Sequence, residues 1–142
     1  MTMEKINKPT RIAQKVILFR KDGKMLTIRR SITAPTRPLS WDLPGGMLDF
    51  GEDPKAGVLR EIKEETKLKV KKLNFFDISS KILTSGEFRI LIIYIANPVT
   101  TKVVLSFEHD DFKWVAPQEF LKLKASPTHK KFVRRFISLQ KK

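Results

Sequence analysis

A helix with a clearly marked start lies near the middle of a chain that otherwise favours strands. Asp53 and Pro54 are typical of a helix cap and a first helical residue, and apolar residues at 58, 59 and 62 give the segment one apolar stripe. We therefore predict a helix over about 54–66. Runs rich in β-branched and aromatic residues lie on both sides of it, so strands should form most of the remaining structure.

Turn signals divide the rest of the chain. Asp22-Gly23 and Ser85-Gly86 are typical of hairpins, and Gly45-Gly46 is interpreted as a turn. Ser126-Pro127 should begin a last helix with one apolar face and one basic face. The predicted strands are two runs within 15–30 and the segments 41–43, 74–80, 88–96, 103–107 and 112–115.

Length and composition limit the kinds of protein this can be. With 142 residues, 41% of them hydrophobic, the chain is long enough for one compact domain over 1–142. The absence of cysteine excludes disulfides, a thiolate nucleophile and cysteine-bound zinc. The opening MTMEKINKPT has no apolar core of a secretion signal, and no apolar run is long enough to cross a bilayer. We therefore expect a soluble, cytoplasmic protein without a membrane partner.

Charge is distributed unevenly along the chain. Lys and Arg number 29 against 15 Asp and Glu, a formal net charge of +14 that attracts nucleic acids and phosphorylated small molecules. Weak nucleic-acid binding through the basic surface is therefore expected. Against this trend, residues 46–65 hold six acids and three bases.

Three glutamates of the predicted helix, Glu61, Glu64 and Glu65, fall within an arc of roughly 100°. Two like charges about 4 Å apart repel by roughly 4 kcal/mol at an effective dielectric of 20, and a divalent cation reverses the sign of that interaction. An all-oxygen ligand set favours Mg²⁺ or Mn²⁺ over zinc. The alternative is a solvated surface helix in which Arg60 and Glu64 form an ordinary i,i+4 pair.

The residues upstream favour the metal interpretation. Residues 45–68 read GGMLDFGEDPKAGVLREIKEETKL, with WDLPGG at 41–46. This stretch resembles the Nudix box, G-x5-E-x7-R-E-U-x-E-E-x-G-U with U aliphatic, and it departs from that pattern only at Lys67, where the family has glycine. The resemblance implies an α/β fold, a Nudix-type α/β/α sandwich with a central mixed sheet.

The resemblance also implies roles for the box residues. Glu64 and Glu65 would bind one to three Mg²⁺ or Mn²⁺ ions together with a backbone carbonyl of Gly45 or Gly46. Arg60 would orient a glutamate through a bidentate ion pair. Glu61 would be a metal ligand or the general base, and Glu52 would lie at the metal or directly behind its ligands.

Residues outside the box are implicated by the same resemblance. A further acid often comes from a loop before a tryptophan-bearing strand, and FEHDDFKWV offers Glu108, with Asp110 or Asp111 as substitutes. The arginines expected to face substrate phosphate are Arg29, Arg30 and Arg37. We interpret His109 as structural or solvated, and His129 as a surface residue of the last helix.

Nudix proteins hydrolyse a nucleoside diphosphate linked to another group, so the resemblance implies such an enzyme acting on a small nucleotide. ADP-ribose and dinucleoside polyphosphate hydrolases of the family carry a proline and a tyrosine after the box, and KILTSGEFR at 81–89 has neither. This favours a normal or modified nucleoside triphosphate, cleaved to monophosphate and pyrophosphate. ADP-ribose, a nucleotide sugar, capped RNA and a non-catalytic nucleotide- or RNA-binding module stay open, as does a homodimer, a state common in the family.

Overall fold

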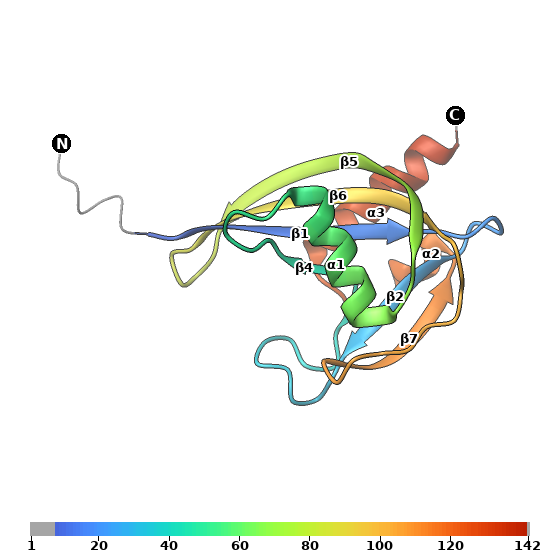
Figure 1. The fold of residues 1–142 in the computed structure, drawn as a ribbon, viewed down its shortest axis with the longest axis horizontal. Helices are drawn as coiled ribbons and strands as arrows, with labels where there is room; N and C mark the ends of the chain where they lie inside the picture. The colour runs from blue at the N-terminus through green and yellow to red at the C-terminus, as the bar shows by residue number, and fades with distance from the viewer. Residues whose placement is uncertain (1–7, 142) are drawn as a thin grey trace.

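The computed structural model describes residues 8–141 and builds them into two β-sheets and three helices (Figure 1). Residues 1–7 and 142 of the expected 1–142 domain lie outside the described residues. The elements are β1 (Thr10–Leu18), β2 (Met25–Arg30), β3 (Trp41–Asp42), β4 (Gly45–Met47), α1 (Pro54–Thr66), β5 (Val70–Ile82), β6 (Phe88–Pro98), β7 (His109–Val115), α2 (Pro117–Phe120) and α3 (Pro127–Gln140). Within 8–141, no helix is long and apolar enough to cross a membrane.

The larger sheet is mixed, with strand order β4-β1-β6-β5. β1 and β6 run parallel at its centre, while β4 and β5 pair antiparallel at the two edges. A second, three-stranded antiparallel sheet has the order β3-β2-β7. The predicted mixed sheet is therefore confirmed, with a smaller sheet beside it.

Helices cover both faces of the larger sheet, as Figure 1 shows for α1 in front and α3 behind. Side chains alternate along β1, so Val16 packs in the core cluster that contains Val58 and Ile62 of α1, and Ile17 packs in the cluster that contains Phe132 of α3. The two cores give the α/β/α sandwich that the sequence predicts, and the first core fixes α1 against the sheet.

The sequence locates both long helices and misplaces some strands. The turn at Asp22-Gly23 is confirmed, because Gly23 has φ +83°, the Arg20 N–H donates to the Lys24 carbonyl, and Phe19 and Met25 form an antiparallel bridge. Beyond this bridge, β1 and β2 belong to different sheets. The Gly45-Gly46 turn is wrong, because these glycines belong to β4. The strand expected at 103–107 is a loop, whose backbone donates instead to the carbonyls of Glu65 and Thr66 at the end of α1. The hairpin turn at Ser85-Gly86 is confirmed, with β5 and β6 longer than predicted.

Both ends of α1 follow from local sequence. The Asp53 carboxylate accepts a hydrogen bond from the Ala56 N–H, and Pro54 occupies the first turn. At the other end, Lys67 takes the left-handed conformation at φ +61°, and its N–H donates to the Lys63 carbonyl. Lysine therefore adopts the geometry that the family pattern assigns to glycine, at the cost of its Cβ in a crowded backbone conformation.

Candidate metal and phosphate site

Two glycines let the carboxylates of α1 reach the edge of the sheet. A Cβ on Gly46 would lie 2.7 Å from the Glu61 carboxylate, and one on Gly45 would collide with the backbone of Gln14 in β1. Gly45 also has φ +132°, a conformation that side chains disfavour. The Gly57 position is equally crowded, because a Cβ there would meet the Glu52 carboxylate at 2.7 Å. Glycine is therefore required at Gly45, where the contact is with backbone, while a side chain at Gly46 or Gly57 would displace the carboxylate of Glu61 or Glu52.

Glu65 is the most enclosed acid of α1, with 6% of its surface exposed. Its Oε1 accepts a hydrogen bond of 2.8 Å from the Gly45 N–H. Burial raises the pKa of Glu65 to about 8, although Lys15 and the Gly45 N–H act in the opposite direction. Burial also raises the pKa of Glu61, against the attraction of Arg60. In both carboxyls the effect of burial outweighs that of the nearby positive charges.

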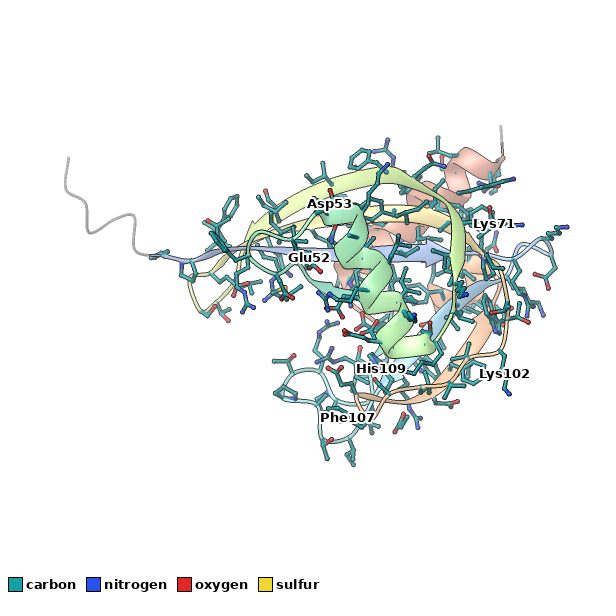
Figure 2. The ribbon with its side chains drawn as sticks, viewed as in Figure 1. Glu52, Asp53, Lys71, Lys102, Phe107 and His109 are labelled. Atoms are coloured by element: carbon teal, nitrogen blue, oxygen red, sulfur yellow. The ribbon has the colours of Figure 1, made fainter. Side chains whose placement is uncertain are left out.

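Arg60 binds the remaining box acids. Its guanidinium forms a bidentate pair with Glu52, at 2.7 and 3.0 Å. The same group donates to Glu61 at 3.1 Å and to Glu64 at 3.3 Å. The hydrogen bond from Arg60 is the main reason that the pKa of Glu52 is lowered. Figure 2 shows Glu52 and Asp53 at the start of α1, and His109 near its other end.

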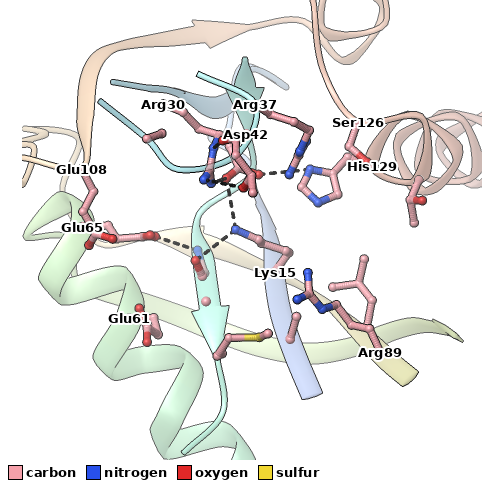
Figure 3. Close-up of a pocket in the computed structure, with 18 of the residues that line it drawn as sticks. Lys15, Arg30, Arg37, Asp42, Glu61, Glu65, Arg89, Glu108, Ser126 and His129 are labelled. Carbon is pink, nitrogen blue, oxygen red and sulfur yellow. Dashed lines mark hydrogen bonds and ion pairs between the residues drawn. The ribbon is translucent and has the colours of Figure 1, made fainter. Parts of the chain in front are cut away.

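A cavity of about 1010 Å³ opens beside these acids (Figure 3). Most of the predicted site residues line it: Arg30, Arg37, Gly45, Gly46, Glu61, Glu64, Glu65 and Glu108. Arg60 and Glu52 lie behind the lining and hold it. Arg29 is not among the lining residues, since it donates to Asp110 at 2.8 Å on the exposed surface.

A buried charge network that the sequence analysis missed forms the floor of the cavity. Asp42 is 1% exposed and forms ion pairs with Lys15 at 3.3 Å and Arg30 at 3.4 Å, while His129 Nδ1 lies 3.2 Å from it without a hydrogen bond. Burial alone would raise the pKa of Asp42, but the charges of Lys15, Arg37 and Arg30 lower it below its usual range. Lys15 Nζ also donates to the Gly45 carbonyl at 3.1 Å, so it links this network to the acidic side.

The assignment of His129 to the surface is wrong. Only 4% of it is exposed, and burial lowers its pKa to about 4 despite the nearby Asp42, so the imidazole is neutral at pH 7. The signal for Lys15 was present in the sequence as Gln14-Lys15, two polar residues inside an apolar strand. Burial of His129 depends on a partner far away in the chain and has no local signal.

The loop before β7 ends at Glu108, and His109 is the first residue of the strand. Glu108 is exposed and lines the cavity, whereas Asp110 is bound to Arg29 and Asp111 accepts from the Phe112 N–H. His109 is 6% exposed and its ring nitrogens have no hydrogen-bond partner within the described chain. Burial lowers the pKa of His109 to about 4. The solvated alternative for His109 is therefore wrong. Of Glu108, Asp110 and Asp111, only Glu108 is among the cavity-lining residues, and the two aspartates lie in β7.

The donor chemistry fits a hard divalent cation. Glu65 and Glu61 are shielded oxygen donors with raised pKa values, and the Gly46 backbone lies against Glu61. Across residues 8–141, no three acidic or histidine side chains stand close enough together to hold an ion as they are placed. Arg60 forms ion pairs with Glu61 and Glu64, and an incoming cation would have to exchange them.

Comparison with known proteins agrees with this geometry. The solved structure of a MutT protein from Methanosarcina mazei Go1 is 29% identical, with a TM-score of 0.77, and the match covers 96% of this chain and 99% of that one. The nucleoside triphosphatase NudI of Escherichia fergusonii is 28% identical over 112 residues, 72% of this chain and 79% of NudI.

A shorter match has higher identity. An RNA pyrophosphohydrolase from Acidiphilium cryptum is 48% identical over 48 residues, 34% of this chain, and the match spans 29% of the relative's own length. The model of the NUDIX domain matches residues 9–136, which include the box, the residues that line the cavity, all of α1 and most of α3. The chain belongs to the NUDIX domain family.

Proposed function

We propose that this protein is a divalent-metal-dependent pyrophosphohydrolase that cleaves a normal or modified nucleoside triphosphate to the monophosphate and pyrophosphate. The proposal rests on one cavity that has carboxylates on one side and cations on the other. Shielded carboxylates of α1 lie against the glycines of β4, and cations from β1 and the loop after β2 lie beside them. The pairing suits an anionic substrate that needs a cation at its phosphates.

Glu65, Glu64 and a carbonyl of Gly45 or Gly46 would hold Mg²⁺ or Mn²⁺ in this proposal. The ion, when bound, neutralises phosphate charge and makes water more acidic. Arg60 pairs with Glu52 and Glu61 and so restricts the positions of these two carboxylates. Glu61 or Glu108 takes a proton from the attacking water, whose oxygen bonds to the phosphorus nearest the nucleoside as the P–O bond from that phosphorus to the leaving pyrophosphate breaks.

On the other side of the cavity, Lys15, Arg30 and Arg37 attract the phosphates. Lys15 and Arg30 are held by Asp42, so their positions are set before binding. The similarity to NudI, which is named a nucleoside triphosphatase, supports the substrate class.

Product analysis on a panel of substrates tests the proposal. The panel holds nucleoside triphosphates, oxidised nucleotides, ADP-ribose, a nucleotide sugar and capped RNA, each with and without Mg²⁺. We expect monophosphate and pyrophosphate from a triphosphate only when Mg²⁺ is present. If only ADP-ribose or the nucleotide sugar is cleaved, that compound is the substrate and the triphosphate is not. If no compound is cleaved although Mg²⁺ still binds, a non-catalytic binding module is favoured.

A further inference from the structure

Three cations that the proposed reaction does not use line the cavity away from α1. We call them the basic wall: Lys81 of β5, Arg89 of β6 and Lys131 of α3. They come from three elements and meet at one cavity. Figure 3 shows Arg89 pointing into the cavity toward Lys15, with Glu61 and Glu65 on the opposite side.

The strand register places two of these charges against each other. Lys81 lies directly opposite Arg89 in the antiparallel pair of β5 and β6. Like charges at opposed positions destabilise a sheet, so this arrangement is unfavourable unless an anion lies between them. Glu87 accounts for part of the Arg89 charge, at 2.7 Å. Within residues 8–141, neither Lys81 nor Lys131 forms an ion pair.

The cavity is larger than the cleaved phosphates require. Its volume of about 1010 Å³ is at the upper end of small-molecule sites, which run from roughly 300 to 1,000 Å³. The phosphoanhydride must lie beside α1, where the acids and the bound cation act. A substrate that extends from there across Lys15 would bring its sugar, and any group on it, to the basic wall.

We propose that the basic wall binds a phosphate group that the substrate carries in addition to its 5′ phosphates. This group is attached to the sugar and is not cleaved. This inference rests on the proposed function, since it places the reacting phosphates at α1. The chemical class is a 5′-polyphosphorylated nucleotide with a further phosphate on its 3′ oxygen. The 5′ end of an RNA chain and a small nucleotide phosphorylated at both positions share this chemistry.

Binding of two ligands that have no phosphoanhydride bond tests the second site directly. Adenosine 5′-monophosphate and adenosine 3′,5′-bisphosphate are titrated by calorimetry in Mg²⁺ and about 0.15 M salt. The wild-type chain should bind the bisphosphate about tenfold more tightly, the gain expected of partly exposed charge-assisted contacts. The double variant Lys81→Ser with Lys131→Ser should lose that preference and keep its affinity for the monophosphate.

A matched control removes the same charge from the same elements. Lys71→Ser with Arg134→Ser also takes one cation from β5 and one from α3, at exposed positions outside the cavity. The control should retain the preference for the bisphosphate. Equal affinity of the wild type for both ligands, or an equal loss in the control, would overturn the second site and leave only general attraction by the net charge.

Turnover then distinguishes an RNA end from a small nucleotide as the source of the 3′ phosphate. It also tests the second phosphate site separately from the proposed function. ATP is compared with adenosine 3′-phosphate 5′-triphosphate and with a 5′-triphosphorylated dinucleotide, by kcat/KM. A preference for the dinucleotide identifies an RNA end, and a preference for the mononucleotide identifies a small molecule. Equal values for all three overturn the second site and leave the proposed function. No turnover, with the binding preference intact, removes the proposed function and keeps the second site.

Discussion

Glu65 is a carboxylate that the fold keeps almost entirely out of water. Its burial raises its pKa to about 8, so at neutral pH the metal-free chain holds a proton there. A cation that binds this carboxylate must displace that proton, and this links metal affinity to pH.

We therefore predict that Mg²⁺ affinity rises with pH between 6 and 8, by up to about tenfold per unit, and levels off above. Calorimetry in two buffers of different ionisation enthalpy measures both the affinity and the protons released. Glu65→Gln should weaken binding and abolish the release. Equal affinity at pH 6 and pH 8 in the wild type would remove Glu65 from the ligand set.

Glu108 is favoured over Asp110 and Asp111 as the acid outside α1 that acts in the reaction, because Asp110 binds Arg29 and Asp111 accepts from the Phe112 N–H. Glu108→Gln should lower kcat by more than tenfold, within the range expected for a lost general base. Asp110→Asn is the control and should change kcat by less than twofold. If the two variants behave alike under steady-state assay with saturating Mg²⁺, Glu108 is a bystander.

The end of α1 shows how an element tolerates a residue that its geometry disfavours. Lys67 is left-handed at φ +61°, and the first residues of the following segment are anchored by Leu68, which is buried in the core. Burial of Leu68 fixes the chain direction, so the backbone must turn at residue 67 whatever side chain is there.

Lys67→Gly should therefore stabilise the protein by about 1 kcal/mol, because glycine takes this conformation without a Cβ clash. Urea unfolding followed by circular dichroism measures the difference. Lys67→Ala removes the charge and keeps the Cβ, so it should give no such gain. A gain of equal size in both variants would mean that the charge of Lys67, and not its backbone, is the cause.

Sequence alone locates elements whose signals are local. The Asp53-Pro54 cap and the Ser126-Pro127 start predict α1 and α3 because a helix depends on residues close in sequence. β4 could not be predicted, since its pairing with β1 is non-local and its glycines have the preferences of a turn. The β-branched run at 103–107 forms a loop because its backbone is bound by the end of α1 and not by a strand.

The residues of the candidate site also fall into those that have a local sequence signal and those that have none. The box acids are visible in the sequence because they follow a fixed spacing on one helix. The Asp42 network is not, since Lys15, Arg30 and His129 reach it from three separate elements. Recognition of such a network requires the packing of both sheets against α3.

At the scale of the whole molecule, two neutral imidazoles are buried around one cavity. Burial lowers the pKa of both His109 and His129 to about 4, below the ordinary 6.5. A base whose pKa is lowered by folding adds stability above 6.5, and that stability is lost as pH falls from 6.5 toward 4.

The double variant His109→Gln with His129→Gln lacks both imidazoles. As pH falls from 6.5 to 4, the free energy of unfolding of the wild type should therefore decrease relative to that of the variant, by no more than about 3 kcal/mol per histidine. Urea midpoints at several pH values measure the difference between the two proteins, which cancels the opposite contribution of Glu65. A constant difference from pH 7 to pH 4 would show that neither imidazole is kept neutral by the fold.

We propose that the acids of α1 make this chain a metal-dependent hydrolase of a nucleotide phosphoanhydride. The most direct test is pyrophosphate release by the wild type and by Glu65→Gln, on the best triphosphate, across a Mg²⁺ titration. We expect release that requires Mg²⁺ and falls by orders of magnitude in the variant, while both proteins unfold at similar urea concentrations. Release that is independent of Mg²⁺, or equal in the two proteins, would contradict it.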